Sequence, residues 1–151
     1  MEAWVSILVT AMRVMRLLED DLEQQHDLSL TWFDVLNRLE QGGGRLRLYE
    51  LEERSVTIRS GMTRLCDRME RAGLIRRERS STDRRGVEIA ITAKGTRTLA
   101  RIWPDHRSSV ERHFARFISD ADAQAIAVAT AKVLAGLGEG FELSRHSVGE
   151  T

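Results

Sequence analysis

Residues 58–91, IRSGMTRLCDRMERAGLIRRERSSTDRRGVEIAI, decide the fold. The first half of this stretch has apolar residues at the i, i+4, i+7, i+8 and i+11 positions of one helix face, followed by the helix stop Ala72-Gly73. The apolar residues are Ile58, Met62, Leu65, Cys66 and Met69. The pattern predicts an amphipathic helix whose apolar face packs on the protein interior.

Polar side chains occupy the opposite face of that helix. They are Arg59, Ser60, Thr63, Arg64, Asp67, Arg68 and Arg71. An arginine can bridge O6 and N7 of a guanine with two hydrogen bonds, and a serine or threonine hydroxyl can reach base edges or phosphate oxygens. We therefore predict DNA contacts at Arg59, Ser60, Thr63, Arg64 and Arg68.

A basic hairpin follows the helix. Residues 74–79 and 87–91 have the composition and alternation of two short strands. The residues between them are polar, end in a glycine and include Asp83, Arg84 and Arg85. Because two arginines on a projecting loop can enter a minor groove, we predict DNA contact at this tip, with Asp83 orienting a neighbouring arginine.

Two more helices are expected before the arginine-bearing helix. One starts near Ser29 or Thr31, either of which can cap it, and ends at the Gly42–Gly44 run; the other covers about 48–54. Helix, turn, arginine-faced helix and basic hairpin together describe a winged helix-turn-helix. The predicted fold class is mainly α with a small β-hairpin.

The remaining helices are expected at the two ends of the chain. After the hairpin, a long helix runs from a Thr92 cap toward Phe117, with a kink or break at Pro104, and a last helix starts at Ser119. Because the terminal helices lack enough partner surface within one chain of this length, we predict a homodimer. The apolar residues of the first and last helices are Trp4, Leu8, Ala11, Met12, Met15, Leu18, Leu22, Ile126, Val133, Leu134 and Leu137.

Charge is balanced over the whole chain but not along it. The 23 basic and 23 acidic residues cancel. Residues 1–53 hold 5 Arg and 11 acids, a net of −6, whereas residues 54–85 hold 10 Arg and 4 acids, a net of +6. An arginine block of this density suits phosphate, although a solvated helix face would also explain it.

Several classes of protein are disfavoured. No apolar run approaches the roughly 18 residues of a membrane span, and the N-terminus lacks the features of a signal peptide, so a soluble cytoplasmic protein is expected. The chain has no nucleophile elbow and no phosphate-binding glycine loop, so we expect no enzyme and no cofactor.

The cysteine and histidines leave two alternatives open. The single Cys66 excludes an intrachain disulfide, and its helical phase favours a core position over a redox sensor. No two of His26, His106, His113 and His146 have the i, i+4 spacing of a helical metal site. We predict no metal site, with a metal sensor as the less favoured hypothesis.

These motifs resemble the MarR family of bacterial transcriptional regulators over about residues 1–137. Residues 28–36, LSLTWFDVL, resemble the opening of the family's second helix, and residues 59–70, RSGMTRLCDRME, its recognition helix. Residues 83–86, DRRG, followed by ITAKG at 91–95, resemble its wing and exit.

The resemblance implies an obligate homodimer that reads a pseudo-palindromic double-stranded operator. Residues 1–25 and 100–137 would form a helical dimerisation region, residues 28–99 a winged helix-turn-helix lobe, and residues 138–151 a disordered tail. Members are commonly repressors, and many release DNA when a small, often aromatic, effector enters the cleft between the two regions.

We hypothesise that such an effector binds where the first, second and fifth helices approach one another. Flexible thioethers and indoles can reshape around a planar guest, although the tryptophans also suit the core. The predicted lining is Met12, Met15, Trp32, Phe33 and Trp103. The alternatives are a redox- or metal-responsive regulator of the same fold and a winged-helix adaptor that binds only proteins.

Overall fold

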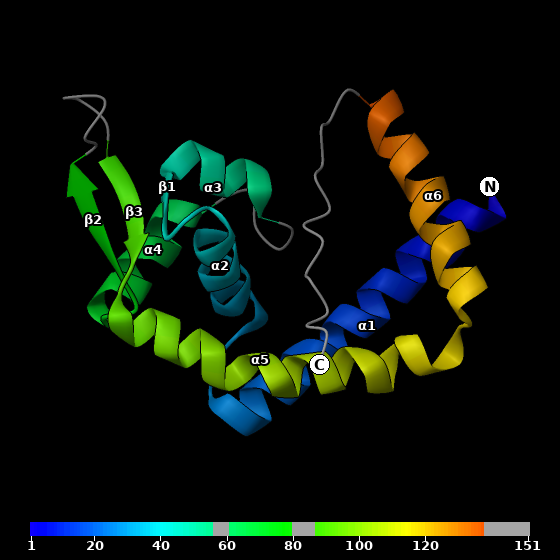
Figure 1. The fold of residues 1–151 in the computed structure, drawn as a ribbon, viewed down its shortest axis with the longest axis horizontal. Helices are drawn as coiled ribbons and strands as arrows, with labels where there is room; N and C mark the ends of the chain where they lie inside the picture. Colours follow the sequence, from blue (N-terminus) through cyan, green and yellow to red (C-terminus); the bar gives the residue numbers. More distant parts are fainter. Residues whose placement is uncertain (56–60, 80–86, 138–151) are drawn as a thin grey trace. The chain divides into compact units, whose positions relative to one another are not determined.

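The computed structural model describes residues 1–55, 61–79 and 87–137, which divide into two compact units at Val110. The first unit contains α1 (Glu2–His26), α2 (Leu30–Gln41), β1 (Arg45–Arg47), α3 (Leu48–Arg54), α4 (Met62–Arg71), β2 (Ile75–Arg79), β3 (Val87–Ile91) and most of α5 (Ala93–His113) (Figure 1). The second contains the end of α5, the 3-10 helix η1 (Ala115–Phe117) and α6 (Asp120–Gly136). No helix in these described ranges is long and apolar enough to cross a membrane.

The described strands form a small antiparallel sheet in the order β1-β3-β2. Leu46 and Arg77 flank Ile89 from the two sides, so all three lie on the face that packs toward α2 and α4. The predicted strand at 87–91 is confirmed, and its partner begins at Ile75, one residue later than predicted. The sequence predicts no strand at β1, because three residues are too few to show an alternation. The predicted hairpin tip lies outside the described residues.

Local signals at both ends of α2 agree with the prediction. The Ser29 hydroxyl caps the helix by accepting a hydrogen bond from the backbone N–H of Trp32, at 3.3 Å. At the other end, Gly43 and Gly44 have φ values of 78° and 89°, a region that favours glycine. The carbonyl of Gly44 accepts a hydrogen bond from the N–H of Ile91, at 2.9 Å. The glycine turn therefore ends α2 and joins it to β3.

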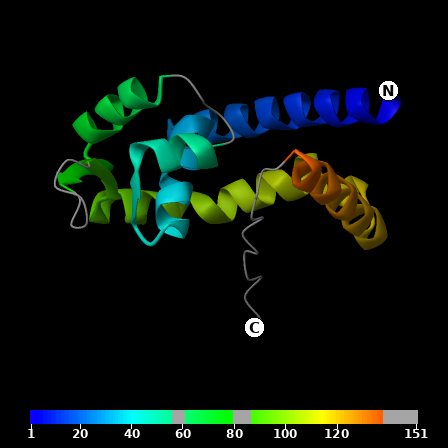
Figure 2. The same cartoon turned by 90° about the horizontal axis from the view of Figure 1, so that it is seen from above.

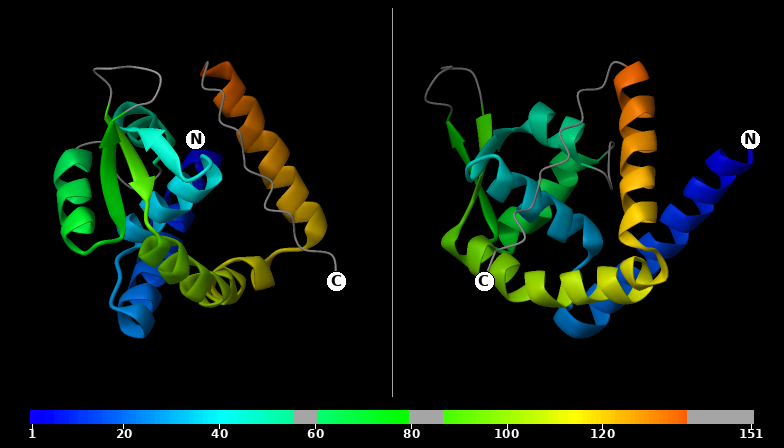
Figure 3. Two further views of the ribbon diagram at one scale, coloured as in Figure 1. Left: turned by 60° about the vertical axis from the view of Figure 1, so that its left-hand side comes forward. Right: turned by 45° about the vertical axis from the view of Figure 1, so that its right-hand side comes forward.

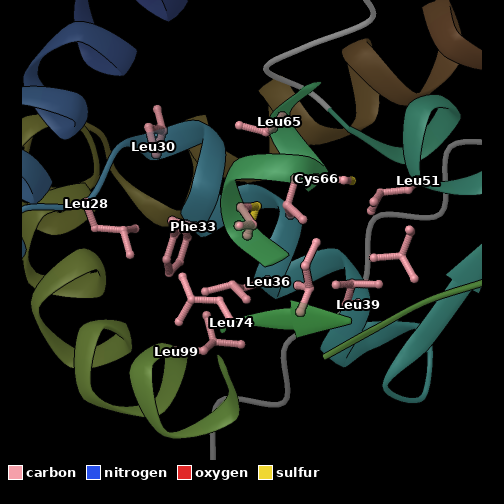
Figure 4. Packing of buried hydrophobic residues seen from close by; sticks show 14 of the residues in the cluster. Leu28, Leu30, Phe33, Leu36, Leu39, Leu51, Leu65, Cys66, Leu74 and Leu99 are labelled. Carbon is pink, nitrogen blue, oxygen red and sulfur yellow. The ribbon is translucent and has the colours of Figure 1, made fainter. Parts of the chain in front are cut away.

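The core of the first unit is built around α2. Figure 4 shows side chains of α2, α3, α4 and α5 converging on one apolar cluster. Its labelled members are Leu28, Leu30, Phe33, Leu36, Leu39, Leu51, Leu65, Cys66, Leu74 and Leu99. Full burial of one leucine side chain is worth about 1.5–3 kcal/mol, so the cluster is the main stabilising element of this unit.

Only the C-terminal half of α1 takes part in this core. Leu18 and Leu22 are buried, and Glu19 accepts a hydrogen bond from the N–H of Leu30, at 2.6 Å. Residues 2–13 are exposed along their whole length, and Figure 2 shows this half of α1 extending away from α2 and α3. The N-terminal half is thus an apolar helix with no covering partner among the described residues of its unit.

The sequence predicts a kink or a break at Pro104, and the structure shows no break. Helix α5 continues through Pro104 from Ala93 to His113. Proline lacks the N–H that would bond to the carbonyl of Ala100, four residues earlier. Both Ala100 and Pro104 are exposed, so water can satisfy that carbonyl and the helix need not end.

Helix α6 begins where the sequence predicts. Ser119 accepts a hydrogen bond from the N–H of Asp122, and the Asp122 carboxylate accepts one from the N–H of Ser119, at 3.2 and 3.0 Å. This reciprocal pair is a capping box. No residue of α6 is buried within the described structure.

The junction between β3 and α5 leaves no room for a side chain at Gly95. The Thr92 hydroxyl donates to the carbonyl of Gly73 and accepts from the N–H of Gly95, at 2.7 and 3.0 Å. A Cβ on Gly95 would lie 2.2 Å from the carbonyl oxygen of Leu74 and 2.7 Å from the Ile91 side chain. The backbone of α5 therefore approaches the start of β2 as closely as glycine permits.

We predict that Gly95→Ala lowers the free energy of unfolding by about 1–3 kcal/mol, because the backbone must shift to admit the methyl group. The matched control is Gly136→Ala, since Gly136 is also helical and its Cβ would meet nothing within 4 Å. That variant should be as stable as the parent or slightly more so. Urea unfolding at one fixed protein concentration compares them, and equal losses in both variants would contradict the steric explanation.

Candidate nucleic-acid interface

Helix α4 has one buried face and one exposed face, as the sequence predicts. The buried face consists of Met62, Leu65, Cys66 and Met69, each of which is at most 1% exposed to solvent. The helix is entered through Gly61, whose φ of 89° turns the chain into its first residue. Predicted residue Ile58 lies outside the described residues.

The exposed face carries three of the predicted DNA-contacting residues. Thr63, Arg64 and Arg68 are all exposed, and neither arginine forms an ion pair with another described residue. Arg64, Arg68 and Arg71 follow one another at spacings of four and three, which places them about 5–6 Å apart along one side of the helix. The other predicted contacts, Arg59, Ser60, Asp83, Arg84 and Arg85, lie outside the described residues.

Arg77 of β2 joins the sheet to this helix. Its Nη1 lies 2.5 Å from Glu70 Oε2, its Nη2 lies 2.6 Å from Asp67 Oδ1, and its backbone N–H donates to Glu70 Oε1 at 2.8 Å. Burial alone would lower the pKa of Arg77, but the hydrogen bonds to Asp67 and Glu70 outweigh it and the pKa is raised. Figure 3 (left) shows α4 lying alongside β2, where this contact forms.

A buried polar pair fixes the end of α3. Ser55, at the C-terminus of α3, donates from Oγ to Asp34 Oδ2 of α2 at 2.7 Å. Arg38 Nε donates to the other carboxylate oxygen at 3.2 Å. The sequence analysis missed this pair because only the i, i+4 spacing of Asp34 and Arg38 is visible in the sequence. The contact holds α3 against α2 just before the chain turns toward α4.

The environment of Cys66 agrees with a core residue. The thiol is fully buried, and burial raises its pKa from 9.0 to about 11. The thiolate required for oxidation is therefore scarce at neutral pH. The described residues contain no group of three His, Cys, Asp or Glu side chains placed to hold a metal ion.

Two of the predicted effector-lining residues stack on each other. The rings of Phe33 and Trp103 lie 5.6 Å apart with an interplanar angle of 16°. Trp32 and Met15 are partly buried against the same core, whereas Met12 is 64% exposed on the projecting half of α1. Four of the five thus lie in or against the core of the first unit, and Met12 lies outside it.

His106 joins this aromatic cluster and was missed by the sequence analysis. Its ring lies 4.2 Å from that of Phe33 and 6.0 Å from that of Trp103. Burial lowers the pKa of His106, so the ring is neutral at neutral pH. Its buried Nδ1 has no hydrogen-bond partner among the described residues. In the sequence, the seven-residue spacing of His106 and His113 indicates only that both lie on one helix face. It does not predict the contact of His106 with Phe33.

The arrangement defines a class of DNA-binding fold. Helices α2 and α3 support α4, whose exposed face is basic, and the strands β2 and β3 follow α4 directly. A helix-turn-helix with an attached hairpin is a winged helix-turn-helix.

Comparison with known proteins gives the family. A sequence model of the MarR family matches residues 26–86. The HTH-type transcriptional regulator YkoM of Bacillus subtilis (strain 168) is 30% identical over 103 residues, which are 68% of this chain and 66% of YkoM.

Solved structures extend the similarity to most of the chain. AbsC, a MarR family regulator from Streptomyces coelicolor, has a TM-score of 0.81 and 30% identity, covering 89% of this chain and 91% of AbsC. Sco3205 from the same organism, solved in complex with DNA, has a TM-score of 0.81 and 24% identity, covering 91% and 87%. The chain belongs to the MarR family of transcriptional regulators.

Proposed function

We propose that the protein is a homodimeric repressor that binds a pseudo-palindromic operator and releases it on binding a small aromatic or apolar effector. The observation that carries the DNA-binding part is the exposed row of Thr63, Arg64 and Arg68 on a helix whose opposite face is buried. Such a helix can enter a major groove, because its polar side chains are not engaged in packing.

Each residue of the row has a distinct proposed role. Arg64 and Arg68 present guanidinium groups that can bridge a guanine or clamp a phosphate, and Thr63 presents a short hydroxyl beside them. Arg59 and Ser60 are proposed to extend this row, Arg84 and Arg85 to contact the minor groove, and Asp83 to orient a neighbouring arginine. These five assignments rest on the sequence.

The first support for a homodimer comes from α1. Trp4 is 61% exposed, and apolar residues occupy most positions of residues 2–13. The polar residues Glu2, Ser6, Thr10 and Arg13 recur at spacings of four, four and three and therefore occupy only one stripe. A helix that is apolar around most of its circumference is stable in water only when protein covers it.

The second support comes from α6. Alanine and branched apolar residues surround this helix, and Val133 and Leu137 are more than 60% exposed. A second copy of the chain would supply the apolar surface that each of these helices lacks, and a pair of identical chains would form a two-fold interface. The two recognition helices would then face successive turns of one side of the DNA, about 10–11 base pairs apart.

The effector is proposed to act at the aromatic cluster of Phe33, Trp103 and His106. An aromatic guest can stack beside the two rings, and its hydroxyl or carboxyl group can pair with the unpartnered His106 Nδ1. A guest that separates α2 from α5 would then change the orientation of the DNA-binding lobe. A hundredfold loss of operator affinity requires a coupling of about 2.7 kcal/mol, which is within the usual range.

Selection from random DNA followed by titration of the selected duplex tests the proposal. We expect Arg64→Ala to weaken operator binding by about 1–3 kcal/mol and to relax the preference at one position. Arg101→Ala removes the same charge from an exposed site on α5 and should change little. A parent protein that enriches no sequence and binds DNA without salt dependence would contradict the proposal and favour the adaptor.

Sedimentation at micromolar concentration tests the dimer. The parent should sediment as a particle of twice 17.2 kDa, whereas Trp4→Glu and Val133→Asp should dissociate or unfold it because they place a charge in the apolar interface. Tyr49→Glu is the control, since Tyr49 is a similarly exposed aromatic residue on α3. A stable folded monomer of the parent would show that the exposed helices have another role.

A screen of aromatic acids and phenols tests the effector site. Compounds that release operator DNA should also change tryptophan fluorescence. Trp103→Phe should remove most of that change while Trp4→Phe keeps it, because Trp103 stacks on Phe33 and Trp4 lies on the exposed half of α1. DNA release that instead follows oxidation of Cys66 or addition of a metal ion would replace the aromatic-effector proposal with one of the other sensing modes.

A further inference from the structure

Arg77 holds α4 at two successive points through one planar group. Its two terminal nitrogens reach Asp67 and Glu70, which lie three residues apart, and its Nη2 also approaches the carbonyl oxygen of Thr63 at 3.5 Å. These contacts extend over most of the ten residues of α4. A lysine offers a single ammonium group and could not span both carboxylates in this way.

The apolar face of α4 leaves its orientation only loosely defined. Two of its four buried side chains are methionines, which adapt to many packing geometries, and apolar contact is not directional. The charged hydrogen bonds of Arg77 are directional. Rotation of α4 about its axis would break them, so they fix which side chains face away from the sheet.

The same contacts engage the two acids that lie nearest the basic row. Asp67 is three residues from Arg64 and four from Arg71, spacings at which an exposed carboxylate pairs with an arginine of its own helix. Instead its Oδ1 is bound by Arg77, although the side chain remains 48% exposed. Among the described residues, Arg64 and Arg68 are left without an acidic partner.

We propose that Arg77 is a positioning residue for DNA recognition, which sets the rotation of α4 and keeps Asp67 and Glu70 from neutralising the arginines that face DNA. This inference rests on the proposed DNA-binding function. Arg77 itself need not touch DNA, because its guanidinium is occupied within the fold.

The test compares full-length dimers on an operator duplex selected with the parent protein and on a scrambled duplex of equal length. Arg77→Gln should reduce the slope of log affinity against log salt by about 0.9 for each phosphate that is no longer neutralised, which corresponds to about tenfold in affinity per phosphate at 0.1 M salt. It should also reduce the ratio of operator to scrambled affinity, because the helix is no longer held in one rotation.

Two further variants separate charge from position. Arg77→Gln combined with Asp67→Asn removes one of the two liberated carboxylates, the one at pairing distance from Arg64 and Arg71, so much of the salt slope should recover while the sequence preference stays weak. Arg76→Gln is the matched control, because Arg76 is the next residue of β2, is 53% exposed and pairs with Glu78 instead. It removes the same charge and should retain the parent's preference.

If Arg77→Gln does not fold, Asp67→Asn alone tests the positioning role of Arg77. It removes one acid and half of the Arg77 bridge, so scrambled DNA should bind as tightly as before or up to several-fold tighter while the preference for the operator falls. If the bridge between Arg77 and Asp67 had only a structural role, Asp67→Asn would weaken binding to both duplexes or to neither.

The contrary outcomes are distinct. A parent that binds no DNA would overturn the proposed function together with this inference. A parent that binds its operator, with Arg77→Gln matching it in slope and preference or with Arg76→Gln weakened as much, would overturn the role of Arg77 alone.

Discussion

Burial of one face of α4 is the constraint on which the interface depends. Met62, Leu65, Cys66 and Met69 enter the core, and each methionine or leucine gains about 1.5–3 kcal/mol by leaving water. Because successive residues of a helix are separated by a fixed rotation, burial of these four side chains also turns the opposite face of α4 toward water. The exposure of Thr63, Arg64 and Arg68 therefore follows from core packing, and the contacts of Arg77 with Asp67 and Glu70 set the rotation of the helix within the range that this packing allows.

The sequence predicts those elements whose signal is local. The inner face of α4, the bounds of β3 and the caps at Ser29 and Ser119 are confirmed, because each depends on residues within one or two turns of one another. Strand β1 is missed because three residues are too few to show an alternation of polar and apolar side chains. Its extended conformation depends on pairing with β3, which is distant in the sequence. Of the kink or break predicted at Pro104, the break does not occur, because the cost of proline depends on whether water reaches the freed carbonyl, and that depends on how α5 packs.

The candidate site also has one part that the sequence predicts and another that it misses. Helical phase alone places Thr63, Arg64 and Arg68 outward, and the structure agrees. The contacts of Arg77 with α4 and of His106 with Phe33 join different elements of the fold. In the sequence, Arg77 is only one of the arginines of a basic block, and His106 is only one of four histidines. Their partners appear only when β2 returns alongside α4 and α5 packs against α2.

The distribution of ion pairs explains how a chain of zero net charge can present a basic helix. Glu78 lies 2.5 Å from Arg76 and 3.8 Å from Arg45, and hydrogen bonding to Arg76 lowers its pKa. Asp67 and Glu70 are bound by Arg77. These acids are thus held by arginines of the strands, which lie on the sheet side of α4. Phosphate attraction depends on which arginines remain without acids rather than on how many the chain contains, and among the described residues Arg64 and Arg68 of α4 have no acidic partner.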